Sequence, residues 1–329
     1  MIRSECYGEY VEHRVVEKKE PNQAPIQKTR HISKRTSELI FVVAMLFFPM
    51  LQFAIFWIIP NFNSIILGFQ LPSGGFTLNN FKKFFEYLAT PKDEIVYAIK
   101  NSLIYFAVSI FISTPLVIFF SYVLFRKVPM SGVFKVVFYL PSIIGATVTT
   151  TLFRALLLEG APAYNLLKAI GFITKDMETM GLFANDSTAF LMVIIYSIWT
   201  CVGINMILFY GAMRRIPHEI FESADIDGAG FFRQFASLVV PLIWPTITTL
   251  IIFSLSGMFI TYTTVMILCP TTKSASMIGW YIVHYTTAKN SHASLNYPAA
   301  VGLAFTAVGL PFVLFVRWLL NKISANVEY

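Results

Sequence analysis

The sequence contains very little charge. Lys, Arg, Asp and Glu together make up 13% of its 329 residues, whereas soluble domains carry about 25%. Hydrophobic residues make up 56%, and Phe alone occurs 32 times. A soluble fold of this length could not hide so much apolar surface, so the composition predicts a polytopic membrane protein. We assign the net charge of +7 to basic loops facing an anionic membrane surface rather than to nucleic-acid binding.

Cysteines and catalytic motifs are also scarce. The three cysteines, Cys6, Cys201 and Cys269, are odd in number and far apart, which excludes a disulfide framework and a zinc pattern. No GxSxG, HExxH or CxxC pattern occurs, so catalysis has little support. Because GxxxxGK[ST] is absent, this chain cannot itself cradle ATP in a P-loop. We predict a non-enzyme without cofactor or metal, and any ATP hydrolysis on another polypeptide.

Ionisable residues are almost absent from the long apolar stretches. Arg154 and Arg317 lie near the ends of such stretches, where long side chains can snorkel. Carriers driven by protons or sodium commonly place Asp, Glu or His in mid-membrane. Their absence argues against a proton relay, although sodium sites built from carbonyl groups stay open. It also argues against an ion channel with charged rings.

Six stretches are long and apolar enough to cross about 30 Å of hydrocarbon, which needs roughly 20 helical residues. Residues 1–37 are polar and mixed in charge, so we predict a disordered cytoplasmic tail before a transmembrane domain over 38–329. The first apolar run begins too late and is too long for a cleavable signal peptide. The predicted spans cover about 39–60, 101–125, 134–157, 189–212, 236–264 and 298–320.

The distribution of Lys and Arg favours both termini in the cytoplasm. With the N-terminus inside, 16 of these residues fall in inside segments and 9 in outside segments, in agreement with the positive-inside rule. Two outside segments have apolar residues at helical spacing, with ordinary loop packing as the alternative. We expect Asn79 or Asn80 to cap a short interfacial helix over 79–88. A second short helix over 161–171 is expected to end at Gly171.

Neutral polar and aromatic groups are frequent in the fourth and fifth spans. Hydroxyls, amides and aromatic faces suit a neutral, hydroxyl-rich solute such as a sugar. The alternative is that each Ser or Thr bonds its own backbone or a neighbouring helix, as is usual in membranes. Asn205 is costlier to bury and is therefore the stronger candidate. The groups are Tyr196, Ser197, Trp199, Thr200 and Asn205, followed by Ser254, Ser256, Thr261, Tyr262, Thr263 and Thr264.

The loop between these two spans predicts a short helix, a turn and a second helix. Pro217 fits the first turn of a helix, where its missing N–H costs nothing. Gly228 can adopt the left-handed conformation that ends a helix, which gives a helix over about 217–228. Pro241 and Pro245 then predict a bend at the cytoplasmic end of the fifth span.

A helix held out from the membrane in this way is predicted to dock another polypeptide. Ile216, Ile220 and Ala224 share one face, with Phe221 beside them. Ser223 and Ala224 are small and would let another surface approach closely. The alternatives are a solvated loop of clustered charge and a carboxylate metal site, which no His or Cys joins at metal spacing. The carboxylates in question are Glu219, Glu222, Asp225 and Asp227.

The segment EIFESADIDGAGFFRQFASLVVPLIWP closely resembles the EAA loop of permease subunits in binding-protein-dependent ABC importers. The family pattern is roughly E-A-A, then D-G-A, then a stretch ending in L-P. This chain has Glu222-Ser223-Ala224, Asp227-Gly228-Ala229 and Val240-Pro241, so Ser replaces the middle Ala and Val replaces Leu. The resemblance covers nearly the whole chain after the tail. Segments such as FKVVFYLPSIIGATVTTTLFRALL and NYPAAVGLAFTAVGLPFVLFVRWLL are similar to the carbohydrate-type, maltose-permease-like branch.

The resemblance implies an all-α, multi-pass protein of the bacterial cell membrane with the type I ABC importer permease fold of six transmembrane helices. In that family the EAA helix is a coupling helix that sits in a cleft of a cytoplasmic ATPase. The family works as two permeases, two ATPases that bind ATP and Mg, and an external solute-binding protein. The short chain after the sixth span favours the first-type subunit of a heterodimer. Matched by position, the coupling residues are Phe221, Glu222, Ser223, Ala224, Asp227 and Gly228.

The resemblance also implies where a transported sugar would be contacted. Family contacts lie mostly on the spans that flank the EAA loop. By distance from that loop they correspond here to Cys201, Val202, Asn205, Ser254, Gly257, Met258 and Thr261.

Two expectations follow from this reading. Gly228→Pro should abolish substrate-stimulated ATP hydrolysis in the assembled complex, and Asn205→Ala should alter uptake more than Ser109→Ala. The alternatives are an ion-coupled secondary carrier, a membrane-embedded glycan enzyme, and the same importer with a substrate that is not a sugar.

Overall fold

The computed structural model of the chain describes residues 34–71, 73–126, 130–287 and 295–324. Within these ranges the backbone forms helices and turns, apart from one isolated bridge between Gln70 and Phe76. The all-α class expected from the sequence is therefore confirmed. Contacts divide the chain into two units, Met1–Ile59 and Pro60–Tyr329, which are described separately.

The first unit contains the first predicted span up to Ile59. Helix α1 (Lys34–Phe53) contains Pro49, and a π-helical turn η1 (Ala54–Ile58) follows it. The predicted span 39–60 falls within an apolar helical run, Glu38–Gly68, that is long enough to cross a membrane. Of the predicted tail, residues 34–37 are helical at the start of α1, and residues 1–33 lie outside the described residues.

Three further predicted spans are single helical runs in the second unit. The predicted spans 101–125, 189–212 and 298–320 correspond to Glu94–Phe125, Ala189–Met213 and Asn296–Lys322. The first of these runs contains a π-helical turn in its middle, where Thr114 Oγ1 donates to the Ser109 carbonyl oxygen (2.8 Å). The elements are α4 (Glu94–Val108), η2 (Ser109–Ser113), α5 (Thr114–Phe125), α10 (Ala189–Met213) and α17 (Asn296–Ser324).

The third predicted span is not one straight helix. It consists of α6 (Ser131–Ile143) and α7 (Ala146–Leu156), which are bent by 105°. Ile144 and Gly145 between them adopt extended conformations, with ψ of 137° and 139°, so the helical ladder stops. The predicted span 134–157 is therefore a bent pair of helices, which together form one apolar stretch long enough to cross a membrane. The break is tolerated because Thr149 Oγ1 lies 3.3 Å from the Ile144 and Gly145 carbonyl oxygens.

The fifth predicted span has the bend that its prolines predicted. The run Phe231–Leu242 meets α14 (Trp244–Ile260) at an angle of 71°. The predicted range of 236–264 is too long at its C-terminal end, because residues 261 and 262 separate α14 from α15 (Thr263–Leu268). The first run comprises α12 (Phe231–Gln234), the π-helical turn η3 (Phe235–Val239) and α13 (Val240–Leu242).

The two short helices predicted outside the spans are present. Helix α3 (Asn79–Ala89) begins without a side-chain cap at Leu78, so neither Asn79 nor Asn80 caps it as expected. Asn80 is buried and instead donates to the carbonyl oxygens of Gly68 (3.2 Å) and Gln70 (3.0 Å), because it lies inside the helix. Helix α8 (Pro162–Ala169) ends before Gly171, whose φ of +77° confirms the predicted stop.

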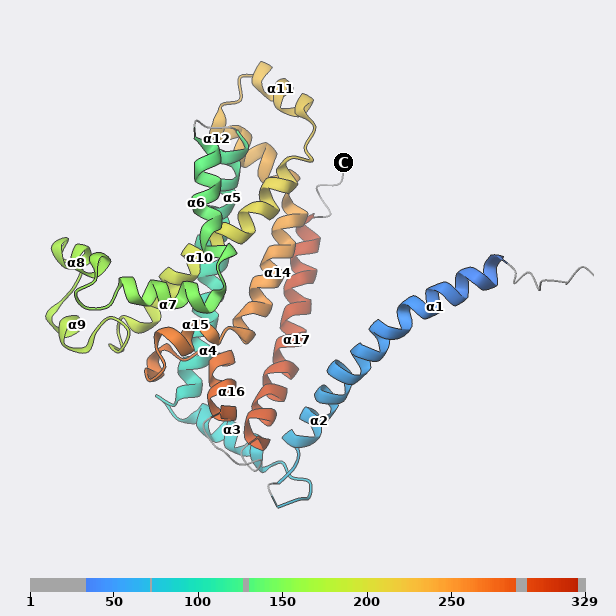
Figure 1. Ribbon diagram of the computed structural model, residues 1–329, viewed down its shortest axis with the longest axis vertical. Coiled ribbons are helices and arrows are strands. Elements are labelled where there is room, and N and C mark those ends of the chain that lie inside the picture. The colour runs from blue at the N-terminus through green and yellow to red at the C-terminus, as the bar shows by residue number, and fades with distance from the viewer. Residues whose placement is uncertain (1–33, 72, 127–129, 288–294, 325–329) are drawn as a thin grey trace, which may run out of the picture. The chain divides into compact units, whose positions relative to one another are not determined.

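In the second unit, α5, α6, α10, α14 and α17 lie along one another (Figure 1). Helix α11 (His218–Ile226) and the turn at Gly228 that follows it, together called the α11 hairpin, lie at one end of these helices, whereas α3 and α16 lie at the other. Buried apolar side chains form three clusters among the described residues of this unit. Two cavities lie between the helices, one on each side of α14. The remaining elements are α2 (Ile59–Gly68), α9 (Lys175–Met180), α11 (His218–Ile226), η4 (Lys273–Ala275) and α16 (Ile278–Thr287).

Candidate functional site

A polar cavity of about 450 Å³ lies between four of the spans. Its walls come from the α4–η2 run, the α6–α7 bend, α10 and α14 with α15. Among the described residues that line it, none is Asp, Glu, Lys, Arg or His. Its polar and aromatic lining includes Tyr105, Ser109, Ser142, Tyr196, Ser197, Thr200, Cys201, Asn205, Phe253, Ser254 and Thr264.

One wall of the polar cavity is held rigidly by α7. Thr150 Oγ1 lies 2.8 Å from the Tyr196 hydroxyl, and the Phe153 ring packs against the Tyr196 ring at 5.3 Å between centroids. Tyr196 is 4% exposed. Because these contacts fix the ring from behind, Tyr196 presents a stable aromatic surface to the cavity.

Some of the hydroxyls in the polar cavity donate hydrogen bonds to carbonyl oxygens of their own helix. Ser197 donates to the Val193 carbonyl oxygen (2.7 Å), and Thr200 donates to that of Tyr196 (3.0 Å). Ser197 and Thr200 therefore bond their own backbone, which was the alternative to a sugar contact. Their oxygens can still accept hydrogen bonds. No hydrogen bond joins the side chains of Ser109, Ser254 or Thr264 to another described residue, so these hydroxyls remain available.

The Asn205 side chain uses only its amide nitrogen in hydrogen bonds to described residues. Its Nδ2 donates to the Cys201 carbonyl oxygen (3.1 Å) and to Cys201 Sγ (3.0 Å), one turn back along α10. No donor among the described residues reaches its Oδ1. An amide oriented by its own helix in this way offers one fixed acceptor to a solute.

Four of the residues expected from the sequence line the polar cavity together, namely Cys201, Asn205, Ser254 and Gly257. Val202 does not, because it is buried in the packed core. Thr261 lies just beyond the end of α14, where it donates to the Gly257 carbonyl oxygen (2.7 Å), and its side chain adjoins the Tyr105 hydroxyl.

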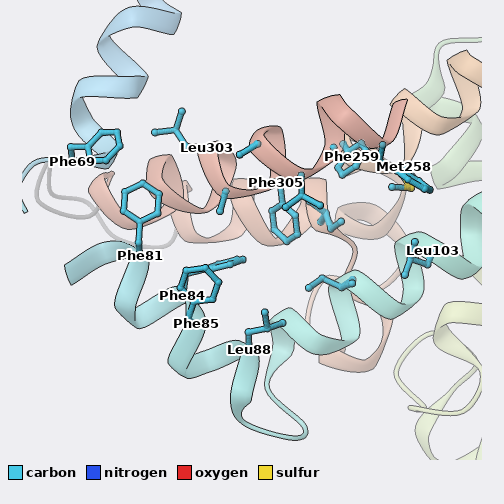
Figure 2. Close-up of a pocket in the computed structure, with 17 residues that line it drawn as sticks. Phe69, Phe81, Phe84, Phe85, Leu88, Leu103, Met258, Phe259, Leu303 and Phe305 are labelled. Carbon is cyan, nitrogen blue, oxygen red and sulfur yellow. The ribbon is translucent and has the colours of Figure 1, made fainter. Parts of the chain in front are cut away.

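Met258 lies apart from the other residues predicted to contact a sugar. It is 3% exposed and lines a second cavity of about 780 Å³ on the other side of α14, whose lining is entirely apolar (Figure 2). Its neighbour Gly257 lines the polar cavity. Adjacent residues of an α-helix point about 100° apart, so the two can face different cavities.

Ser109 is also placed differently from the expectation. It was the residue expected to lie off the path, but it lines the polar cavity together with Asn205. Tyr105 and Ser109 are four residues apart and therefore share a helix face. The shared face of these two polar residues was the signal that could have placed the second span at the cavity.

The loop between the fourth and fifth predicted spans forms α11 and the turn that follows it. Gly228 has φ of +70°, which an L side chain adopts only with strain. The Ala229 N–H donates to the Ala224 carbonyl oxygen (2.9 Å), and the Gly228 N–H donates to that of Asp225 (3.1 Å). This pair of bonds is the Schellman motif, so the predicted glycine stop is confirmed.

Side chains attach α11 to two different spans. The Phe221 ring is 3% exposed and packs against the Phe125 ring of α5 at 5.4 Å between centroids. Gln234 of α12 is 2% exposed, and its Nε2 donates to Asp225 Oδ1 (2.5 Å) and to the Ala229 carbonyl oxygen (2.7 Å). These contacts join α11 to α5 and α12.

The two faces of α11 differ in exposure. Ala224 is 9% exposed and lines a hollow of about 310 Å³ together with Ile220 and Leu238. Glu222, Ser223 and Asp227 lie on the exposed side, and Glu222 Oε1 lies 3.0 Å from His218 Nδ1. Ile226 is 86% exposed and was not selected from the sequence.

The family described as "Binding-protein-dependent transport system inner membrane component" matches residues 96–328. The chain is 24% identical over 300 residues to the arabinooligosaccharides transport system permease protein AraP of Bacillus subtilis (strain 168), covering 90% of this chain and 91% of AraP. It is also 24% identical over 281 residues to the multiple sugar-binding transport system permease protein MsmF of Streptococcus mutans serotype c (strain ATCC 700610 / UA159), covering 85% and 91%.

A solved structure shows the same fold. This structure is a bacterial alginate ABC transporter in complex with alginate pentasaccharide-bound periplasmic protein. One of its chains matches with a TM-score of 0.75 at 22% identity, covering 89% of this chain and 98% of that one. The expected type I permease fold is therefore confirmed.

Proposed function

Since this chain belongs to the family of inner membrane components of binding-protein-dependent transport systems, we propose that it is a permease subunit of an ATP-driven sugar importer. With a second permease it forms the path of a neutral sugar or oligosaccharide that an external solute-binding protein delivers. The sequence contains no GxxxxGK[ST] motif, so we assign ATP hydrolysis to two cytoplasmic ATPase subunits.

The polar cavity is the observation that carries the proposal. Its free hydroxyls, its oriented Asn205 amide and its tyrosine rings match the hydroxyls and apolar ring faces of a sugar. A charged solute would need a pairing side chain, because an unpaired charge in this setting is costly. None of the described residues that line the cavity is Asp, Glu, Lys, Arg or His, which favours a neutral solute.

The relatives support a saccharide over other neutral solutes. AraP is a transport protein for arabinooligosaccharides, and MsmF belongs to a multiple sugar-binding transport system. The structural match to an alginate transporter involves an acidic polysaccharide. We infer that the present chain differs from that transporter in accepting uncharged saccharides, because the polar cavity lacks a cation to pair with uronate groups.

The α11 hairpin is proposed as the coupling element. Phe221 and Gln234 attach it to two spans, whereas Glu222, Ser223 and Asp227 are exposed for contact with an ATPase. In this arrangement α11 and both termini face the cytoplasm, which agrees with the distribution of Lys and Arg. Closure of the ATPase dimer would displace α11 and, through it, the walls of the polar cavity.

Cys201 provides a direct test of the path. In the assembled complex with Cys6 and Cys269 changed to Ser, a membrane-permeable thiol reagent should modify Cys201, because it lines the polar cavity. Arabino-oligosaccharides with the binding protein should slow that modification. A matched complex that keeps only Cys269, which is 1% exposed, should react slowly with or without sugar. Modification of Cys201 at the same rate with every saccharide tested would contradict the proposed path.

Ser254 and Ser256 form a matched pair for the uptake assay. Ser254 lines the polar cavity and has no hydrogen bond to another described residue. Ser256 lies on another face of α14, where it donates to the Ile252 carbonyl oxygen (3.1 Å). Loss of one hydrogen bond to the solute predicts a drop in uptake of about fivefold to tenfold for Ser254→Ala and little change for Ser256→Ala. Equal effects would place the path elsewhere.

A further inference from the structure

The apolar cavity beside α14 is not part of the proposed sugar path. Every residue that lines its roughly 780 Å³ is apolar, from Phe, Leu, Ile, Met, Val, Ala and Gly alone. It is formed where α3 crosses the ends of α4 and α17 (Figure 1), and Figure 2 shows Phe81, Phe84 and Leu88 of α3 along it. A sugar has no hydrogen-bonding partner there, so this cavity suits a hydrocarbon.

The depth of this cavity matches one leaflet of a bilayer. Its lining on α17 runs from Leu303 to Phe312. Nine residues of α-helix rise about 14 Å, which is about half of the roughly 30 Å hydrocarbon core. The cavity therefore extends from the level of α3 to near the middle of the membrane, as an acyl chain does.

Helix α3, which lines part of the cavity, also carries exposed positive charge. Its apolar side, with Phe81, Phe84 and Phe85, faces the cavity, whereas Lys82 and Lys83 are exposed on its other sides. This is the pattern of a helix that lies in the interface plane. Neither ammonium group forms an ion pair with a carboxylate of the described residues, so both are available for a phosphate group.

We propose that the apolar cavity holds one acyl chain of an anionic phospholipid whose phosphate group lies against Lys82 and Lys83. The hydrocarbon lining retains the chain, and the two ammonium groups select the headgroup. The lipid is thereby held beside Met258 and Phe259, on the opposite side of α14 from the polar cavity. The site belongs to the lipid phase and does not depend on the identity of the transported solute.

Photolabelling tests the site in the complete complex. The complex is placed in nanodiscs of phosphatidylcholine with phosphatidylglycerol that carries a diazirine near the end of one acyl chain. After irradiation, label should appear in peptides from α17 and α14 that line the cavity. Ala304→Phe fills the cavity and should reduce this label about tenfold, which is about 1.4 kcal/mol and corresponds to displacing about two methylene groups. Thr306→Phe, at an exposed position two residues further along α17, should leave the label unchanged.

The lysines are tested separately, so that the site stays testable if the filled variant fails to assemble. Lys82→Gln with Lys83→Gln should reduce the preference for phosphatidylglycerol over phosphatidylcholine about fivefold per lysine, or about 1 kcal/mol each. Lys175→Gln with Lys273→Gln removes the same charge from exposed positions that do not line the cavity. Equal preference in the two double variants overturns the headgroup assignment. The lipid site is overturned if Ala304→Phe leaves the label unchanged. It is also overturned if a photoreactive residue placed at Val308 captures the second permease.

Discussion

Gly228 provides the sharpest test of the coupling hairpin, because its neighbour Gly230 is a built-in control. Alanine at either position adds one methyl group in open space, since no heavy atom lies within 4 Å of the new Cβ. Gly228 has φ of +70°, whereas Gly230 has φ of −68° and ψ of 170°, which any residue adopts. A difference between the two variants therefore reports backbone conformation alone.

The cost of the change follows from this geometry. An L side chain in the left-handed region costs about 1–2 kcal/mol. Relief of that strain opens the turn and breaks the Gly228 and Ala229 bonds to the carbonyl oxygens of Asp225 and Ala224. Strain of this size changes the ratio of closed to open hairpins by about 5-fold to 30-fold. Gly228→Pro should act more strongly, because proline removes the Gly228 N–H and fixes φ near −65°.

The assay is sugar-stimulated ATP hydrolysis by the assembled complex in nanodiscs with its binding protein. Gly228→Ala should reduce the stimulation by at least about 5-fold with normal insertion, whereas Gly230→Ala should retain it. Gly228→Asn should recover part of it, since Asn tolerates the left-handed region better. Equal stimulation in the Gly228→Ala and Gly230→Ala complexes would refute the coupling role of this turn.

Three further changes test other contacts. Gly203→Ala should destabilise the subunit by about 1–3 kcal/mol, because the added Cβ would collide with a carbonyl oxygen of α6. Thermal unfolding in detergent measures this loss. The control, Gly211→Ala on the same helix, should show none, because its added Cβ has no neighbouring heavy atom within 4 Å. Ile226→Ser should weaken ATPase association about tenfold or more in a binding titration, because the substitution removes the roughly 1.5–3 kcal/mol that burying the Ile side chain at the interface would contribute. Gln234→Glu should impair coupling by placing a carboxylate beside Asp225. Adding Asp225→Asn should restore part of it by returning a donor to that contact, while the bond to the Ala229 carbonyl oxygen stays lost. No recovery would argue against the Gln234–Asp225 bond as the link.

The spans and the hairpin turn were predictable because each depends on a local property. A run of about 20 apolar residues requires no knowledge of its neighbours to be assigned to the membrane. Gly228 and Pro241 act through their own backbones, so the turn and the 71° bend follow from residue type. The break at residues 144 and 145 was missed although Pro141 and Gly145 are local helix-breaking signals. The Thr149 hydroxyl that supports the break is recognised only in three dimensions.

The lining of the polar cavity was only partly predictable, for the same physical reason. Helices α10 and α14 are apolar on nearly every face, so their sequences do not show which face is turned inward. Position relative to the EAA loop therefore grouped Met258 with Gly257, although the two line different cavities. Ser109 was missed because a lone Ser in a membrane helix usually bonds its own backbone, and here its hydroxyl does not.

The position of α14 links the three sites that the structure brings out. Through the 71° bend it continues from the α12–α13 run, where Gln234 is bonded to the α11 hairpin. Along its length Gly257 lines the polar cavity and Met258 the apolar one. A displacement of α11 that reaches α14 therefore cannot alter one cavity without altering the other. If the coupling and lipid proposals both hold, occupancy of the apolar cavity must change the sugar-stimulated rate of ATP hydrolysis, since a ligand that prefers one position of α14 shifts the population toward it.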